Sequence, residues 1–101
     1  MSAKGSRIEL AGRAMRDLRR IDTPERRRIR EALELLASGA ENADIKALTG
    51  QAPWLRLRTG DWRVLYRPLT EAEAVEGGPG FLVAPVVNRR DLLRAVRTLD
   101  I

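Results

Sequence analysis

The chain contains no cysteine and no histidine among its 101 residues. Without cysteine it can form neither disulfide bonds nor thiolate metal sites, which fits a reducing compartment. Without histidine it lacks the commonest metal ligand and the side chain that most often serves as general acid or base near neutral pH. We therefore expect a cytoplasmic protein with no metal site and no cofactor.

Long apolar runs are absent as well. No stretch approaches the length that crosses a bilayer, and Met1–Ser6 has no apolar signal region. We expect a single domain, residues 1–101, because the chain is too short for two domains with separate cores. A domain of this size has a thin core, so a bound partner would add useful stability.

Lysine is scarce in a chain that is nevertheless basic. Lys and Arg together number 19 against 14 acidic residues, a formal charge of +5, and the only lysines are Lys4 and Lys46. A GC-rich genome would favour arginine everywhere. Phosphate recognition would favour it locally, because guanidinium groups bind phosphate oxygens bidentately and stay charged. The distribution of the arginines has to decide between these explanations.

Hydrophobic spacing predicts a strand and two helices in the first part of the chain. Arg7–Leu10 alternates polar and apolar residues, as strands do. Helical spacing follows over about Ala11–Ile21 and again from Thr23, the predicted cap, with Pro24 in the first turn, to a stop at Ser38–Gly39. The link is so short that the helices must form an antiparallel hairpin, whose apolar stripes need a sheet to cover.

The remainder predicts three strands and a last helix. In order, we expect a polar connector (Glu41–Pro53), a hairpin (Trp54–Arg58 and Trp62–Arg67), an acidic loop (Glu71–Gly80), a strand (Phe81–Val87) and a helix (Asp91–Leu99). Pro85 cannot donate to a strand ladder, so a bulge or unpaired position is expected there. The predicted fold is α+β, in the order β-α-α-β-β-β-α. An antiparallel sheet of about four strands carries the helical hairpin on one face.

The arginines of the C-terminal half concentrate in the hairpin and after the last strand. They are Arg56, Arg58, Arg63, Arg67, Arg89, Arg90, Arg94 and Arg97. Codon bias alone would not separate them from the acidic loop. Arg56 and Arg58 share one face of their strand, and Leu55 and Leu57 point to the helices on the other. The arginine face predicts a phosphate-binding surface, and an ordinary solvated outer face is the alternative.

A second basic run lies on the second predicted helix. Its members are Arg26, Arg27, Arg28 and Arg30, with Glu25, Glu31 and Glu34 nearby. Because these glutamates lie within helical reach, we interpret the run as exposed i,i+3 and i,i+4 ion pairs rather than as a binding site.

Two aromatic residues, Trp62 and Tyr66, alternate with Arg63 and Arg67 along the second hairpin strand. Rings at such positions can stack on unpaired bases, as in proteins that hold single-stranded RNA. They can equally fill the edge of a thin core. Trp62 is taken as a candidate base-stacking residue and Tyr66 as a core residue.

The clearest motif lies in the middle of the chain, where Asp44–Gly50 (DIKALTG) is followed by Trp54–Tyr66 (WLRLRTGDWRVLY). This stretch resembles the middle of RelE/ParE toxins, in which a K-x-L-x-G connector precedes R-L-R-x-G-x-[YW]-R-[VL]-x-Y. The element order matches too, and the resemblance covers about Ile8–Arg94. It implies a RelE-like fold, the role of toxin in a type II toxin–antitoxin system, and an acidic antitoxin that wraps the toxin.

The resemblance also implies an activity, since RelE-type members are ribosome-dependent endoribonucleases. They cut mRNA by activating a ribose 2′-hydroxyl against the adjacent phosphate, so the ribosome and mRNA are implied partners. By this resemblance Arg63 contacts the scissile phosphate, Arg56 stands where a catalytic lysine or arginine lies on the preceding strand, and Arg89 stabilises charge at the reacting phosphate. The RNA-binding candidates around them are Lys46, Arg58, Trp62, Arg67 and Arg90.

Three positions depart from the family pattern. Asn88 stands where many active members have histidine, Leu93 where they have tyrosine, and Trp54 where some have a further lysine. Arginine stabilises an anionic transition state but accepts protons poorly. With no side chain poised as a base, the cleavage rate should rise with pH. Two alternatives stay open: a ParE-like toxin that inhibits DNA gyrase, and a catalytically degenerate module that binds antitoxin or RNA.

Overall fold

The computed structural model describes residues 6–75 and 77–99. Met1–Gly5, most of the segment considered above for a signal region, lies outside the described residues, as does Glu76 of the acidic loop. The strands are β1 (Arg7–Leu10), β2 (Asp44–Ala47), β3 (Leu55–Thr59), β4 (Trp62–Pro68) and β5 (Gly80–Asn88). The helices are α1 (Gly12–Arg19), α2 (Thr23–Ser38), α3 (Glu71–Ala74), η2 (Arg89–Asp91, a 3-10 turn) and α4 (Leu92–Val96).

The strands form one sheet in the order β1-β5-β4-β3-β2. The α+β class is confirmed, but the expectation of about four antiparallel strands was wrong in two details. β1 pairs parallel to β5, because the chain passes through the helices, β2, β3 and β4 before β5 returns beside it. β2 is a fifth strand inside the segment predicted as a connector. It buries no side chain and is held by its antiparallel pairing with β3.

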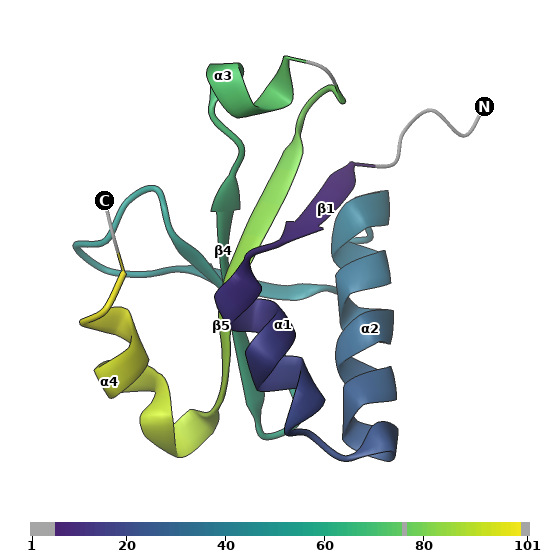
Figure 1. Cartoon of the computed structure of the whole chain (residues 1–101), viewed down its shortest axis with the longest axis vertical. Helices are drawn as coiled ribbons and strands as arrows, with labels where there is room; N and C mark the ends of the chain where they lie inside the picture. The colour runs from purple at the N-terminus through teal and green to yellow at the C-terminus, as the bar shows by residue number, and fades with distance from the viewer. Residues whose placement is uncertain (1–5, 76, 100–101) are drawn as a thin grey trace.

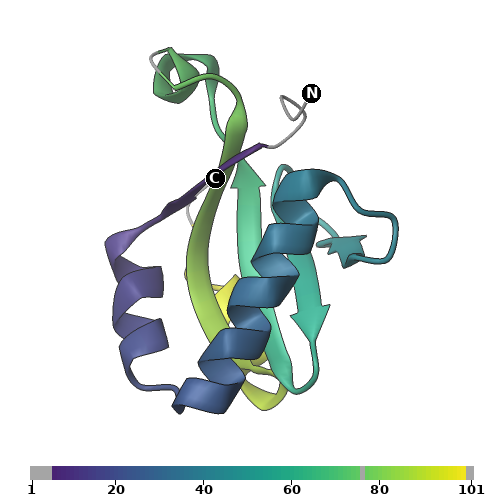
Figure 2. The same ribbon diagram turned by 90° about the vertical axis from the view of Figure 1, so that its right-hand side faces the viewer.

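Helices α1 and α2 pack on one face of the sheet, and α4 packs on the other (Figures 1 and 2). The first core lies under α1 and α2. It joins helical residues such as Ile29 and Leu36 to the strand residues Leu57, Val64 and Val83. The spacing of apolar residues along both helices predicted this face, and the Schellman-type end of α2 at Gly39, with φ of 75°, closes the helix where expected.

A second, smaller core lies beneath α4. Trp54, Leu65 and Ala95 are buried there, with Leu92 and Val96 packed around them. Trp54 is only 4% exposed. The last helix, which the sequence analysis did not place, therefore covers part of the face predicted to carry the arginines, and the rest of that face holds them.

The bulge expected at Pro85 is confirmed. Between the pairs Val64–Val86 and Tyr66–Val83, a single residue of β4 faces two residues of β5, one of them Pro85. The main-chain N–H of Val86 is satisfied from outside the sheet, because it donates to the Asp17 carboxylate on α1 at 2.9 Å. This bond ties the first helix to the centre of the sheet.

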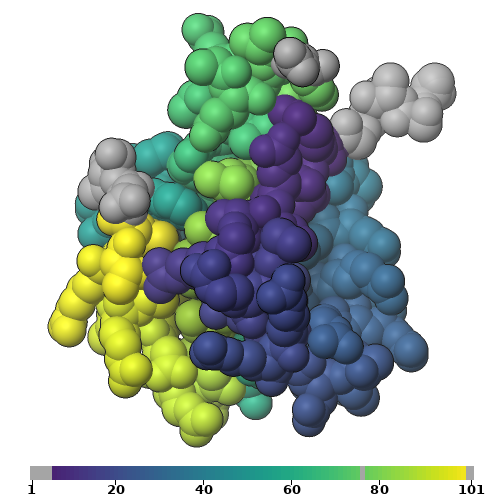
Figure 3. All heavy atoms as spheres, viewed as in Figure 1, coloured from purple at the N-terminus to yellow at the C-terminus, as the bar shows by residue number. Residues whose placement is uncertain are grey.

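Two local predictions need correction. The N-cap of α2 is Asp22 rather than Thr23, and Thr23 is the first helical residue, whose hydroxyl accepts from Arg26 instead. The acidic loop contains the short helix α3, which begins with a capping box between Thr70 and Glu73. This segment projects beyond the body of the molecule (Figure 3). Among the described residues, the structure contains no helix long and apolar enough to cross a membrane.

Candidate nucleic-acid interface

A row of polar side chains crosses the part of the sheet that no helix covers. Asp44 of β2 pairs with Arg58 of β3, and Arg58 pairs with Arg63 of β4. Cross-strand partners point to the same face of a sheet. The neighbouring residues Leu57 and Val64 lie in the first core on the opposite face. The predicted register, with arginines on one face and leucines on the other, is therefore confirmed.

A second row lies beside the first. Lys46 of the edge strand pairs with Arg56, and Arg56 pairs with Leu65, which is buried under α4. The Arg56 side chain is only 13% exposed, and its Nη1 lies 3.4 Å from Asp44 Oδ1. The other carboxylate oxygen, Oδ2, lies 3.9 Å from Nε of Arg58. One carboxylate thus contacts two of the candidate arginines.

Arg63 lies among several positive charges. Its guanidinium donates to main-chain carbonyls beside the hairpin turn, that of Gly60 at 2.9 Å and that of Trp62 at 3.1 Å. Partial burial lowers the pKa of Arg63 from its ordinary value, and nearby guanidinium groups lower it further. Those groups belong to Arg58, Arg56 and Arg89. An anion bound here would relieve their mutual repulsion.

Arg89 reaches this site from the end of β5. Its main-chain N–H donates to the Asp61 carbonyl at 2.7 Å, and its Nε lies 3.8 Å from the Asp61 carboxylate. Asn88 caps the turn that follows, since its Oδ1 accepts from the Arg90 N–H at 3.1 Å. These contacts hold the end of β5 against the hairpin turn. We call Arg56, Arg58, Arg63 and Arg89 the arginine cluster, and it includes all three arginines predicted to be catalytic.

The other basic RNA-binding candidates differ in whether their charge is already paired with a carboxylate. Lys46 and Arg90 are exposed, and neither forms an ion pair within the described part of the chain. Arg67 is different, because its guanidinium binds both carboxylate oxygens of Glu73, at 2.8 and 3.0 Å. It also lies over the Trp54 ring, 5.8 Å from the centroid. Arg67 therefore holds α3 against the sheet and is less available to a phosphate.

The two aromatic residues of β4, Trp62 and Tyr66, lie on the face of the sheet that α1 and α2 cover. Trp62 packs against the first core, and its Nε1 donates to Glu25 of α2 at 3.2 Å. Alternation along β4 places it on the face opposite to Arg63, so the structure does not bring this candidate to the arginine cluster. Tyr66 is 2% exposed and makes an edge-to-face contact with Phe81, at 5.3 Å between centroids. Its assignment to the core is confirmed.

Two carboxylates lie beside the arginine cluster, Asp44 and Asp61. The sequence analysis singled out neither, because Asp61 lies between the two predicted hairpin strands and Asp44 lies in the segment predicted as a connector. The alternation of polar and apolar residues in Asp44–Ala47 was the available signal, but four residues without a buried side chain make a weak strand pattern.

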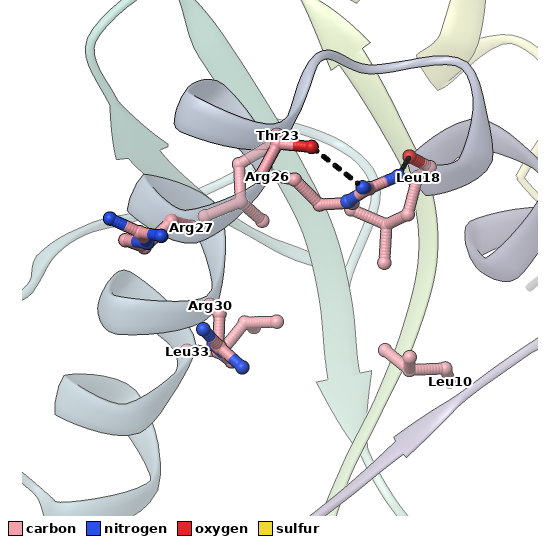
Figure 4. Close-up of a pocket in the computed structure, with 8 residues that line it drawn as sticks. Leu10, Leu18, Thr23, Arg26, Arg27, Arg30 and Leu33 are labelled. Atoms are coloured by element: carbon pink, nitrogen blue, oxygen red, sulfur yellow. Dashed lines mark hydrogen bonds between the residues drawn. The ribbon is translucent and has the colours of Figure 1, made fainter.

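A groove between the two long helices is a separate surface (Figure 4). Its volume is about 440 Å³, with an apolar lining formed by Leu10, Leu18, Ile29 and Leu33. Three arginines of α2 also line it: Arg26, Arg27 and Arg30. Arg26 is fixed by hydrogen bonds to the Leu18 carbonyl and the Thr23 hydroxyl, at 3.3 and 3.1 Å.

In the part of the chain that the structure describes, the ion pairs predicted for this second basic run are confirmed only at Arg28, whose Nη1 lies 3.8 Å from Glu25 Oε2. Among the described residues, Arg27 and Arg30 have no carboxylate partner. The solvated-helix interpretation therefore does not account for these two side chains, and they remain available to charges outside the chain.

Comparison with known proteins finds no matching family model and no matching curated protein. Solved structures do match. The RelB–RelE antitoxin–toxin complex from Methanococcus jannaschii contains a chain with a TM-score of 0.65 and 18% identity, covering 86% of this chain and 96% of that one. The RelBE2 toxin–antitoxin complex from Mycobacterium tuberculosis contains a chain with a TM-score of 0.65 and 21% identity, covering 84% of this chain and 99% of that one.

The archaeal RelE–RelB complex from Pyrococcus horikoshii gives a TM-score of 0.57 at 21% identity, covering 88% of this chain and 97% of that one. Agreement over nearly the whole of each chain decides the architecture. The chain has a RelE-like fold. At these identities the likeness is one of fold, and the chemistry has to be argued from the residues.

Two of the three departures from the family pattern lie at the end of β5 and on the helix that follows it. Asn88 uses its side chain to cap the following turn. Leu93 is 75% exposed on α4 and offers no polar group. Neither residue supplies an acid or base to the arginine cluster.

Proposed function

We propose that this chain is the toxin of a type II toxin–antitoxin system and that it cleaves mRNA on the ribosome. The arginine cluster is the observation that carries the proposal, because it gathers four guanidinium groups on the open face of a RelE-like sheet. The RelE-like fold supports the same assignment. A soluble cytoplasmic protein without cofactor or metal is the form in which we expect it to act.

The chemistry follows from where charge develops during cleavage. Attack of a ribose 2′-oxygen on the neighbouring phosphate creates extra negative charge on the phosphate oxygens, which preorganised cations stabilise. In this proposal Arg63 contacts the scissile phosphate together with Arg58, its partner on the neighbouring strand. Arg56 and Arg89 stabilise the negative charge that develops on the phosphate oxygens. Lys46 and Arg90, exposed at the border of the cluster, would contact flanking phosphates.

An acidic antitoxin would explain the groove of α1 and α2. Its apolar lining fits the nonpolar side of an amphipathic helix, and Arg27 and Arg30 on its edge fit carboxylates on the same helix. The thin core and net charge of +5 point the same way. We propose that the antitoxin contains such a segment, folds on binding, and wraps the toxin.

The test is cleavage of mRNA on programmed ribosomes by the native chain, Arg63→Ala and Arg63→Lys. Removing one preorganised donor should slow cleavage by about 10²–10³-fold. Lysine should restore only part of the rate, because a point charge cannot reproduce the bidentate fork. Arg94→Ala, a surface arginine of α4 outside the cluster, is the matched control and should keep native activity. A fully active Arg63→Ala protein would contradict the assignment of the cluster.

A gyrase-directed toxin and a degenerate binding module remain the second candidates, and both are favoured by one observation. Asn88 and Leu93 supply no proton-transfer group at the end of β5. If the native chain arrests growth without cleaving ribosome-bound mRNA, an assay of gyrase supercoiling with purified protein separates the two. Inhibition identifies a ParE-like toxin, and its absence leaves a module that binds antitoxin or RNA.

A further inference from the structure

We propose that Asp44 is the proton acceptor for the attacking 2′-hydroxyl, an inference that rests on the proposed nuclease function. The cross-strand row places the carboxylate of Asp44, on β2, beside the two cations that would hold the phosphate. These cations are Arg58 on β3 and Arg63 on β4. Neighbouring strands are about 4.8 Å apart. A phosphate held between Arg58 and Arg63 would therefore leave its neighbouring ribose close to the Asp44 carboxylate.

The chemistry of the cluster requires such a group. Guanidinium groups stay protonated and cannot take the 2′ proton. Within the described residues, only Asp44 and Asp61 bring a carboxylate within 4 Å of an arginine of the cluster. Both oxygens of Asp44 are oriented by ion pairs, with Arg56 and Arg58, and its side chain remains 51% exposed to an incoming ribose. A proton acceptor needs this combination of fixed orientation and access.

Asp61 is less suited to the same role. It lies on the hairpin turn, and its contact is with Arg89, which stabilises charge at the reacting phosphate in the proposed function. It also acts electrostatically on Arg63, which contacts that phosphate. A carboxylate in this position would repel the phosphate rather than face the ribose next to it. Asp44 instead belongs to a paired strand and stands at the end of the row.

The 2′-hydroxyl gives its proton to Asp44 and its oxygen attacks the adjacent phosphorus, which forms a 2′,3′-cyclic phosphate. The bond from phosphorus to the 5′-oxygen of the next nucleotide breaks, and that oxygen takes a proton from water. Asp44 then returns its proton to solvent. No oxidant, metal or cofactor enters the step.

Several charged groups lie around Asp44. They are Lys46 on the same strand, Arg56 and Arg58 on β3, Arg63 one strand further, and Arg28 and Glu31 of α2 across a small cavity of about 270 Å³ that Asp44 also lines. Positive charges predominate around its carboxylate. An aspartate base, which is ordinarily ionised above about pH 6, should give a cleavage rate that is flat above that pH. This replaces the rise with pH that the sequence suggested.

The experiment is single-turnover cleavage on programmed ribosomes across about pH 6 to 9, with native protein, Asp44→Asn, Asp44→Glu and Asp61→Asn. The native rate should be flat with pH. Asp44→Asn should cleave about 10²–10⁴-fold more slowly than native protein near neutrality. Its cleavage rate should rise about tenfold per pH unit, because hydroxide replaces the missing base. Asp44→Glu should recover part of the rate with a flat profile, and Asp61→Asn should keep the native profile.

Binding of a short non-cleavable RNA, with 2′-deoxyribose at the scissile position, separates catalysis from positioning. Asp44→Asn should bind it at least as tightly as native protein, since a negative charge has been removed. The proposal fails if Asp44→Asn slows cleavage by one factor at every pH, which would indicate a role only in positioning Arg56. It fails equally if Asp61→Asn, rather than Asp44→Asn, changes the profile. Absence of cleavage by the native chain would instead overturn the proposed function, and the inference with it.

Discussion

Arginines that look alike in the sequence differ in what they can bind. Within the described residues, Arg63 donates only to main-chain carbonyls, and it lies among other guanidinium groups whose repulsion a bound anion would reduce. Arg67, four residues later on the same strand, already has a bidentate carboxylate partner in Glu73. Hydrogen bonding to Glu73 raises the pKa of Arg67 above its ordinary value. The same residue type therefore serves a candidate site at one end of β4 and holds a loop at the other.

The Arg67–Glu73 pair gives a prediction about pH. Hydrogen bonds from Arg67 and from the Thr70 backbone lower the pKa of Glu73 to about 2. A carboxylate whose pKa is depressed on folding stabilises the fold above its unfolded pKa, near 4.3, and that stability is lost as pH falls toward 2. In Arg67→Met, NMR titration of the Glu73 carboxylate should therefore show a midpoint shifted upward, toward 4.

Thermal unfolding between pH 5 and about pH 2 checks the linkage of this pair to stability. The acid-induced fall in Tm should be smaller in Arg67→Met than in native protein. Glu71→Gln is the control, because it removes a carboxylate of the same short helix that contacts neither Arg67 nor Thr70 in the described structure. An unchanged Glu73 midpoint in Arg67→Met would show that the ion pair does not form in solution.

At the scale of elements, the edges of the sheet depend on close backbone contacts rather than on buried side chains. β1 pairs parallel to β5, and this pairing places Gly80 opposite Arg7. A Cβ at Gly80 would collide with the Arg7 carbonyl oxygen. The Leu69 N–H also donates to the Gly80 carbonyl, at 2.9 Å, so the backbone is held from both sides. Glycine is required here because two strands approach closely.

Gly80→Ala should therefore destabilise the protein by about 1–3 kcal/mol, the usual cost of overpacking. Equilibrium urea unfolding measures the change. Gly12→Ala in the first turn of α1 is the matched control, because its new methyl group would meet only the end of the flexible Arg16 side chain, at 3.5 Å. It should be neutral or slightly stabilising. Equal effects of the two substitutions would contradict the pairing of β1 with β5.

At the scale of the whole molecule, two arginine-bearing surfaces are built on different elements. The arginine cluster lies on β3, β4 and the turn that follows β5. The groove lies between α1 and α2 (Figure 4), the helices that pack on the opposite face of the sheet from α4 (Figure 2). RNA and a protein partner could therefore be recognised by separate residues. Under the proposed function, an antitoxin confined to the groove would leave the cluster open, and we expect a second antitoxin segment that reaches the cluster.

The groove can be tested by charge reversal. Arg27→Glu with Arg30→Glu should weaken binding of the antitoxin by tenfold or more, a loss of about 1.4 kcal/mol or greater. Calorimetric titration of the cognate antitoxin measures the affinity, and burial of the apolar groove should appear as a negative heat-capacity change. Arg16→Glu with Arg19→Glu makes the same change in net charge on α1 outside the groove. If both pairs weaken binding equally, only long-range attraction is involved.

Much of the fold could be predicted because its signals are local. Apolar spacing in the two long helices, turn residues between the hairpin strands, and the missing donor of Pro85 each act within a few residues of chain. The faces of Arg58 and Leu57 followed from the two-residue period of a strand. The α+β class and the gathering of arginines on one face were therefore determined by the sequence itself.

The tertiary structure decided which distant segments pair with one another. β2 is a strand only because β3 lies beside it, and that contact brings Asp44 to Arg58. Arg89 meets Asp61 only after β5 has paired with β4. Trp54 is buried because α4 folds back over it. Such contacts have no signature in local spacing, since their energy comes from residues far apart in the chain, and they are what turns a basic strand into a candidate site.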